Sequence, residues 1–357
     1  MVFLLNYIYS VAYTYLLGKD YSHYRLTSRG LFFLLLPLLL LWLMISGGQD
    51  SVGTDYESYM YIFEGNQLDY FKGKHEYLFV AIVSLCNAIG IQGQALFYVF
   101  YGINFVFLFF ILKRFSIRRI FIFVLLYFTI TNLFNNQLNI LRQATAVYIG
   151  TYATFLVFET KYIKALFFIL IATFIHQSAI ILLLLFCFKC LTYKLTPRLL
   201  LLCLVIAVCL SIILQVDFFS FLTPFLPDDY AWHIMGGGTS ERGILQKMTK
   251  YIFIPIYLLA WQYFRDNKLT KDEVWLFKIG WLSFCLRLSV INVTIISRVS
   301  DYFLILSIFP ILLYLDHLMV VRKTFLFVSI IFFLSLFYSL KITIFATGEY
   351  LYQSIYF

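Results

Sequence analysis

The sequence predicts an all-α polytopic membrane protein with about 12–13 transmembrane or re-entrant helices. Hydrophobic residues make up 62% of the 357-residue chain and charged residues only 13%, about half of the roughly 25% that is usual in soluble domains. Long apolar runs, such as residues 31–45 and 199–214, lack the alternation of barrel strands. Because lipid offers no hydrogen bonds to the backbone, runs of this kind must form helices.

The segments expected to form these helices follow one another with short polar connections. They span residues 2–17, 30–47, 77–90, 95–112, 120–134, 144–158, 165–175, 179–188, 199–216, 250–264, 274–296, 302–316 and 324–342. Several are shorter than the ~20 residues of a straight crossing, which predicts tilted or broken helices. No repeat of fixed period and no linker rich in Pro, Gly or Ser is visible. Residues 1–357 are therefore expected to form one integral membrane domain.

Lysine and arginine gather in alternate connections, which predicts the orientation of the chain. Most of the 27 basic residues fall at 18–29, 113–119, 159–164, 189–198, 265–273 and 317–323. These connections are expected in the cytoplasm, and the loops 48–76 and 217–249 outside. Two full crossings between residues 77 and 112 would put Lys113 and Arg114 outside. We therefore expect one of the segments 77–90 and 95–112 to be re-entrant or interfacial. The alternative, with loop 48–76 inside, weakens the charge bias at 18–29.

A polar segment follows the second apolar run, from Gly48 to Tyr59. Gly53 permits a tight turn, and Asp55 is well placed to cap a following amphipathic helix. The functional interpretation is a carboxylate at the membrane surface that accepts a proton from a sugar hydroxyl or orients it. Glu76, at the start of the next apolar run, is a second candidate base.

The densest polar cluster beside an apolar segment runs from Asn135 to Gln143. On a helix, Asn135, Asn139, Arg142 and Gln143 would share one face, which then offers amide groups together with a guanidinium. An arginine at this depth is costly unless it faces a wet cavity or a partner. The guanidinium of Arg142 presents a planar fork of N–H groups, which is well suited to binding a phosphate. The alternative is a structural arginine that reaches the interface.

His176 ends the apolar run 167–175. It is interpreted either as a packing residue or as a hydrogen-bond partner of a sugar or phosphate oxygen. No HExxH pattern accompanies it, and the chain has no paired-carboxylate motif for Mg²⁺. We therefore expect neither a metal nor another cofactor.

Three further arginines are candidates for an anionic ligand. Arg298 precedes Asp301 by three residues, so the two can simply pair. Arg287 lies deep in segment 274–296, where a charge marks a functional hypothesis by default. Arg242 would add positive charge from the long external loop.

Five polar motifs occur in a fixed order along the chain. They are Gly53-Thr54-Asp55-Tyr56 with Tyr59, Glu76-Tyr77, Asn139-x-x-Arg142-Gln143, Phe174-x-His176-x-Ser178-Ala179, and Arg298 followed by Tyr302-Phe303. In this order and spacing, over roughly residues 30–310, the chain resembles the Wzy-like, EpsG family of polysaccharide (O-antigen, capsule or exopolysaccharide) polymerases. An arginine often precedes the Gly-x-Asp of that family, and here the position holds Val52 or Gln49.

The resemblance implies a GT-C-like glycosyltransferase of the inner (cytoplasmic) membrane that works on the extracytoplasmic face. It would transfer a glycan from undecaprenyl diphosphate to a sugar hydroxyl of another lipid-linked repeat unit. The implied partners are the undecaprenyl-diphosphate-linked oligosaccharide, membrane lipid, a chain-length regulator and a flippase, without nucleic acid.

Each candidate residue has an expected role in this reaction. Arg142 and Arg298 would hold the departing diphosphate, supported by Arg287 or Arg242. Asp55 or Glu76 would serve as the base. The remaining substrate-binding candidates are Asn139, Gln143, His176 and Tyr302.

Two other functional classes stay open. A lipid-linked oligosaccharide flippase or other transporter would also need a basic cavity, but it usually has internal repeats and charges near the bilayer midplane. A membrane O-acyltransferase would use a histidine, for which Trp232-His233 is a candidate. That pair lies in a loop containing Gly and Pro and not on a buried helix.

Overall fold

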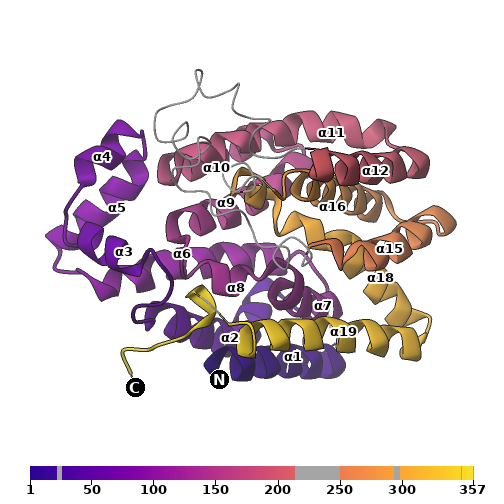
Figure 1. The fold of residues 1–357 in the computed structure, drawn as a ribbon, viewed down its shortest axis with the longest axis horizontal. Coiled ribbons are helices and arrows are strands. Elements are labelled where there is room, and N and C mark those ends of the chain that lie inside the picture. The colour runs from indigo at the N-terminus through magenta and orange to yellow at the C-terminus, as the bar shows by residue number, and fades with distance from the viewer. Residues whose placement is uncertain (22–25, 214–249, 293–297, 347, 357) are drawn as a thin grey trace. The chain divides into compact units, whose positions relative to one another are not determined.

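The computed structural model describes residues 1–21, 26–213, 250–292, 298–346 and 348–356 (Figure 1). Helices dominate these ranges, and the β-pairing within them is one isolated bridge between Gln49 and Ser354. The prediction of an all-α polytopic membrane protein is confirmed, and the GT-C-like arrangement stays a prediction. The whole of loop 217–249, with Arg242 and the Trp232-His233 pair, lies outside the described residues.

The described chain divides into two compact units, residues 1–183 with 318–357 and residues 184–317. The first unit holds α1 (Val2–Tyr21), α2 (Ser28–Gly47), α3 (Tyr56–Phe63), α4 (Leu68–Gly73), α5 (Tyr77–Ala88), α6 (Gln94–Leu112), α7 (Ile117–Leu126), the π-helix η1 (Tyr127–Thr131), α8 (Leu133–Asn136), α9 (Leu141–Phe158), α10 (Tyr162–Ile175), the 3₁₀ segment η2 (Gln177–Leu183), α19 (Thr324–Thr343) and η6 (Gly348–Tyr350). The second holds α11 (Leu184–Lys194), α12 (Pro197–Ile213), α15 (Ile254–Asp266), α16 (Lys271–Ser289), η4 (Asp301–Phe303), η5 (Leu306–Ile308) and most of α18 (Phe309–Val320).

Three of the described helices are long and apolar enough to cross a membrane unaided, namely α2, α6 and α19. Shorter apolar helices cover Tyr77–Ala88, Tyr162–Ile175, Gln177–Lys189, Pro197–Ile213 and Leu306–Val320. The 12 residues of α5 extend about 18 Å and the 19 of α6 about 28 Å, against a hydrocarbon core of ~30 Å. Of the two segments, these lengths favour α5 as the one that does not cross the membrane.

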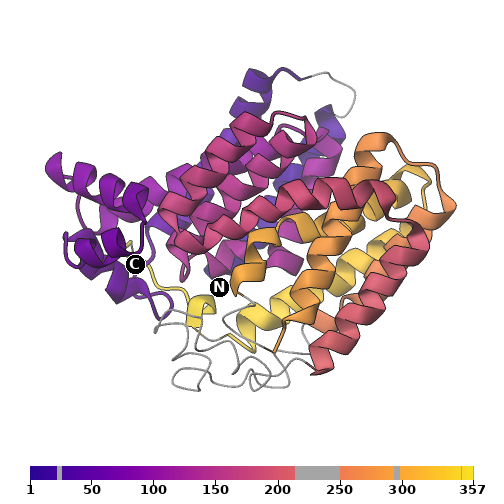
Figure 2. The ribbon, with the colours of Figure 1, turned by 90° about the horizontal axis from the view of Figure 1, so that it is seen from above.

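Helix α9 is the central element of the first unit, because α6 and α10 both pack along it (Figures 1 and 2). Its buried face is rich in small residues, which let neighbouring backbones approach closely. At Gly150 a side chain would collide with Leu182 of η2. The close approach fixes the segment that follows His176 against the middle of α9.

Before α9, the chain leaves α7 through the π-helix η1 and turns at Asn132, which has a left-handed φ of 51°. Gln137, fully buried, then accepts a hydrogen bond from Tyr148 at 3.1 Å. Tyr148 also shares a hydrogen bond with Tyr127 of η1. A buried polar network therefore ties the segment before α9 to the helix itself, and so fixes where Asn139 and Arg142 lie.

Candidate functional site: a buried Glu–Arg–His cluster

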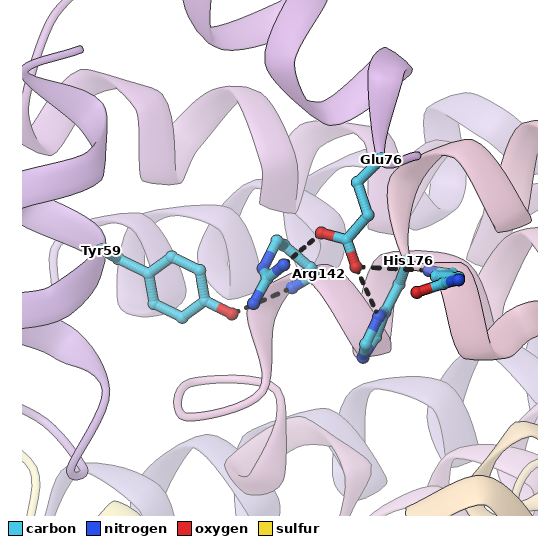
Figure 3. Close-up of polar contacts among 5 residues, drawn as sticks. Tyr59, Glu76, Arg142 and His176 are labelled. Atoms are coloured by element: carbon cyan, nitrogen blue, oxygen red, sulfur yellow. Dashed lines mark hydrogen bonds and ion pairs between the residues drawn. The ribbon is translucent and has the colours of Figure 1, made fainter. Parts of the chain in front are cut away.

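Glu76 lies at the centre of the candidate site, between Arg142 on one side and His176 on the other (Figure 3). Its side chain is only 1% exposed. Oε2 forms an ion pair with Nη1 of Arg142, and Oε1 lies 2.9 Å from Nδ1 of His176. Oε1 also accepts a hydrogen bond from the backbone N–H of Gln177 at 3.3 Å. Both carboxylate oxygens are thus held within the protein.

Three helix ends bring these residues together. Glu76 directly precedes α5, Arg142 lies in the first turn of α9, and His176 directly follows α10. Because α10 packs against both α5 and α9, the three ends meet on one side of the first unit. The polar residues that interrupt apolar runs in the sequence are therefore neighbours in the fold.

Aromatic rings enclose the guanidinium of Arg142. Its central carbon lies 4.4 Å from the ring centroid of Phe71, 5.2 Å from Phe79 and 6.0 Å from Tyr59. The hydroxyl of Tyr59 also accepts a hydrogen bond from the backbone N–H of Arg142 at 3.4 Å (Figure 3). Among the described residues, the buried Nε of Arg142 has no hydrogen-bond partner. One N–H of this side chain therefore remains to be satisfied.

The contacts set the charge states of Glu76 and His176. Burial would raise the pKa of Glu76, but the hydrogen bond from His176 and the charge of Arg142 outweigh it, so that this pKa is lowered. Burial lowers the pKa of His176 below its ordinary 6.5, although the bond to Glu76 acts in the opposite direction. At neutral pH the cluster therefore contains a carboxylate, a guanidinium and a neutral imidazole.

The ionised carboxylate also determines the tautomer of His176. Because a carboxylate can only accept, the proton of this hydrogen bond belongs to Nδ1 of the imidazole. In the neutral ring, Nε2 then carries the lone pair. The arrangement is that of a carboxylate that orients a histidine, with the basic nitrogen on the far side of the ring.

Asn139 holds the Asp55 loop in place. Its side-chain Oδ1 accepts hydrogen bonds from the backbone N–H groups of Thr54 at 2.8 Å and Asp55 at 3.0 Å. The approach requires glycine at position 53, where φ is +77° and an added Cβ would lie 2.6 Å from that oxygen. The side chain of Asp55 makes no cap hydrogen bond to α3, which favours the functional interpretation of this residue.

The Asp55 loop and the Glu76 cluster belong to one site. Helix α3 starts directly after Asp55 and carries Tyr59, which contacts Arg142, one turn later. Asn139 lies in the turn just before α9, and Arg142 lies in its first turn. The expectation of one helical face from Asn135 to Gln143 is therefore wrong, because α8 ends at Asn136 and the chain turns before α9 begins. The structure thus brings together Asp55, Glu76, Asn139, Arg142 and His176, and Gln143 is buried at the same end of α9.

The other predicted residues belong to the second unit, apart from Arg242. Nη2 of Arg287 lies 3.5 Å from Oδ1 of Asp301, and Nη1 donates to Oγ of Ser307 at 3.5 Å. Arg298 is exposed, and Tyr302 is fully buried. Arg287 thus lies within ion-pair distance of Asp301.

Sequence reasoning missed how Glu76 acts and what surrounds it. Phenylalanine is common in this chain, so nothing in the sequence marks Phe71 and Phe79 as neighbours of Arg142.

Sequence reasoning also missed Glu349, near the C-terminus. Burial raises the pKa of its carboxyl, and the charge of Asp55 raises it further. Glu349 therefore lies within electrostatic range of the Asp55 loop, a relation across almost 300 residues that no local pattern signals.

Comparison with known proteins identifies one family. The model of the EpsG family matches residues 31–354, almost the whole chain. Neither the comparison with curated proteins nor the comparison with solved structures found a match. The matched range contains every motif residue of the Glu76 cluster and of the Asp55 loop.

Proposed function

Because the chain belongs to the EpsG family, we propose that it is a Wzy-type polysaccharide polymerase. It transfers a glycan from undecaprenyl diphosphate to a sugar hydroxyl of another lipid-linked repeat unit, on the external face of the inner membrane. A flippase that delivers the units and a regulator of chain length are the proteins with which it would work.

The observation that carries this proposal is the carboxylate–imidazole pair of Glu76 and His176 at the ends of apolar helices. Glycosyl transfer needs a group that accepts the proton of the attacking hydroxyl. Nε2 of a neutral His176, oriented by Glu76, suits this task. Glu76 itself is a weaker candidate for the base, because both of its oxygens are engaged and its pKa is lowered.

The reaction proceeds as one displacement. The acceptor oxygen forms a bond to the anomeric carbon while the bond from that carbon to the phosphate oxygen breaks. The lipid diphosphate leaves with the electron pair, and the proton of the hydroxyl passes to Nε2 of His176. Asp55, in the loop held by Asn139, accepts a hydrogen bond from the acceptor sugar and orients it.

The arginines stabilise the departing diphosphate. Arg142 keeps Glu76 ionised through the ion pair, and its unsatisfied Nε–H is suited to a phosphate oxygen. Arg298 and Arg287 belong to the second unit, and they stay candidates for further positive charge on the sequence argument alone. The mechanism uses no metal ion, since the guanidinium groups take the place of a cation.

The test is chain-length analysis with the purified full-length protein and synthetic undecaprenyl-diphosphate-linked repeats, with and without EDTA. The wild type is expected to make polymer in both conditions. Arg142→Ala and Arg298→Ala are expected to make none while still inserting into the membrane. Full-length polymer from both variants would exclude the proposed role of the arginines, and loss of wild-type activity in EDTA would exclude a metal-free mechanism.

The same substrates separate the two other functional classes. A flippase would move lipid-linked repeats across a proteoliposome membrane without joining them. An O-acyltransferase would leave chain length unchanged and alter acyl content. Either result in place of polymer would contradict the proposed function.

A further inference from the structure

The first unit has a second polar site, at the opposite ends of the helices that form the candidate active site. It is a pocket of about 370 Å³. Its polar lining consists mainly of Lys113, Arg114, Tyr152, Glu159, Lys161 and Lys164. These residues come from the end of α6, the end of α9 and the start of α10.

Positive charge exceeds negative charge in this pocket, because four cations line it with one carboxylate. Glu159 is shared by two of them. It forms an ion pair with Nη1 of Arg114, and its Oε2 lies 2.8 Å from Nζ of Lys161. In the described part of the chain, no carboxylate pairs with Lys113 or Lys164. The described residues therefore do not neutralise the pocket.

Arg114 is held in a fixed position but is incompletely satisfied. Its guanidinium lies over the rings of Tyr152 and Phe155, at 5.5 Å and 5.0 Å from their centroids. Its Nε is buried and has no hydrogen-bond partner among the described residues. A rigid guanidinium with an unused N–H, beside two unneutralised lysines, is suited to an oxyanion such as a phosphate group.

The position of the pocket indicates where that oxyanion comes from. Helix α6 is one of the helices long and apolar enough to cross a membrane. It begins at Gln94, which accepts a hydrogen bond from Tyr56 beside the Asp55 loop, and it ends next to Lys113 of the pocket. Its 19 residues extend about 28 Å, close to the ~30 Å of a bilayer core. The pocket therefore lies at the membrane interface opposite the Glu76 cluster. The charge bias of the connections predicts that this interface is cytoplasmic. Phospholipid phosphates lie at this depth, and basic pockets between helices bind anionic head groups.

We propose that this pocket binds the phosphate group of an anionic phospholipid of the inner leaflet. Lys113 and Lys164 contact the phosphate oxygens, the guanidinium of Arg114 adds fixed positive charge beside them, and the apolar residues at the ends of α6 and α10 face the acyl chains. The proposal concerns a site separate from the Glu76 cluster and does not depend on the reaction catalysed there.

Native mass spectrometry of the full-length protein released from nanodiscs tests the proposal. One nanodisc contains phosphatidylglycerol and the other phosphatidylcholine, and a third sample adds inorganic phosphate to detergent-purified protein. Wild-type protein is expected to retain phosphatidylglycerol in preference to phosphatidylcholine. The variants Lys113→Ala and Lys164→Ala are each expected to lower the retained phosphatidylglycerol about fivefold, since a basic residue near an anionic surface contributes roughly that factor.

Two controls make the outcome specific to the pocket. Lys323→Ala removes an exposed lysine of another connection predicted to be cytoplasmic and should leave lipid retention unchanged. Lys164→Arg keeps the charge and should also retain the lipid. Equal retention by the wild type and both pocket variants would overturn the proposal. Retention of inorganic phosphate in place of phosphatidylglycerol would also overturn it, because the phosphate source would then not be lipid.

Discussion

Glu76 is the residue that joins the parts of the candidate site, because it contacts both the guanidinium of Arg142 and the imidazole of His176. Removing the cation would leave a carboxylate that is 1% exposed without its partner, and breaking a buried ion pair from one side costs about 3–5 kcal/mol. The sequence marks Glu76 only as an acid at the start of an apolar run. Its role as the contact of two distant residues depends on the packing of α5, α9 and α10.

Substituting Glu76→Gln tests this residue through the pH dependence of polymer formation. If neutral His176 is the base, wild-type activity falls as the pH drops through the pKa of His176, which is lowered below its ordinary 6.5. Glu76 raises that pKa through its hydrogen bond and its charge. Replacing the Glu76 carboxylate by a neutral amide should therefore shift the fall in activity to lower pH. It should also reduce the maximal rate of polymer formation roughly 10- to 100-fold, because the imidazole of His176 is less firmly oriented.

The matched control is Glu64→Gln, which changes an exposed acid at the end of α3. It should alter neither the pH at which activity falls nor the maximal rate of polymer formation. A fall in activity that stays at the same pH or moves to higher pH in Glu76→Gln would contradict the orientation of His176 by Glu76.

At the scale of elements, the sequence predicts most helices but not how they meet. Apolar runs locate α2, α6, α9 and α19 because burial in lipid requires helix. The sequence also identifies Gly53, Asp55 and Asn139 as candidates for a site. It does not reveal that the Asn139 side chain binds the backbone after Gly53, since the two lie about 85 residues apart and a turn pattern carries only local information.

The variant Gly53→Ala tests this contact. The backbone at position 53 is left-handed, and the new Cβ would crowd Oδ1 of Asn139. The loop must therefore shift, and Asp55 must move with it. We expect a loss of stability of about 1 kcal/mol or more, measured by thermal unfolding in detergent, together with reduced polymer formation. Gly102→Ala in α6 is the control, because no atom lies within 4 Å of its added Cβ. It should be neutral or stabilising. Equal effects of the two substitutions would argue against a specific fit at Gly53.

At the scale of the whole molecule, the charge bias of the sequence and the helix geometry of the first unit agree. Helices α2, α6, α9 and α10 each have one end near the Glu76 cluster or the Asp55 loop and the other end at the basic pocket. The chain passes between the two units twice, after Leu183 and after His317. The sequence gives no sign of the first boundary, because it falls inside an unbroken apolar stretch where composition does not change.

This arrangement predicts opposite accessibility for two engineered cysteines. In a protein whose native cysteines are replaced, Glu57→Cys at the start of α3 should react with a membrane-impermeant maleimide in intact spheroplasts. Lys19→Cys near the end of α1 should react only after permeabilisation. Both parent residues are exposed, so exposure does not account for a difference. Labelling of both sites, or of Lys19→Cys alone, in intact cells would contradict the proposed external position of the active site.

The most direct measurement compares the same substitution at two histidines in the purified polymerase assay. His176→Asn removes the imidazole that Glu76 orients, whereas His75→Asn removes an exposed imidazole bonded to Tyr77. The proposed mechanism predicts that His176→Asn lowers the rate of polymer formation about 10²- to 10⁴-fold while the folded protein remains in the membrane, and that His75→Asn keeps the wild-type rate. Polymer of normal length formed at the wild-type rate by His176→Asn would contradict it.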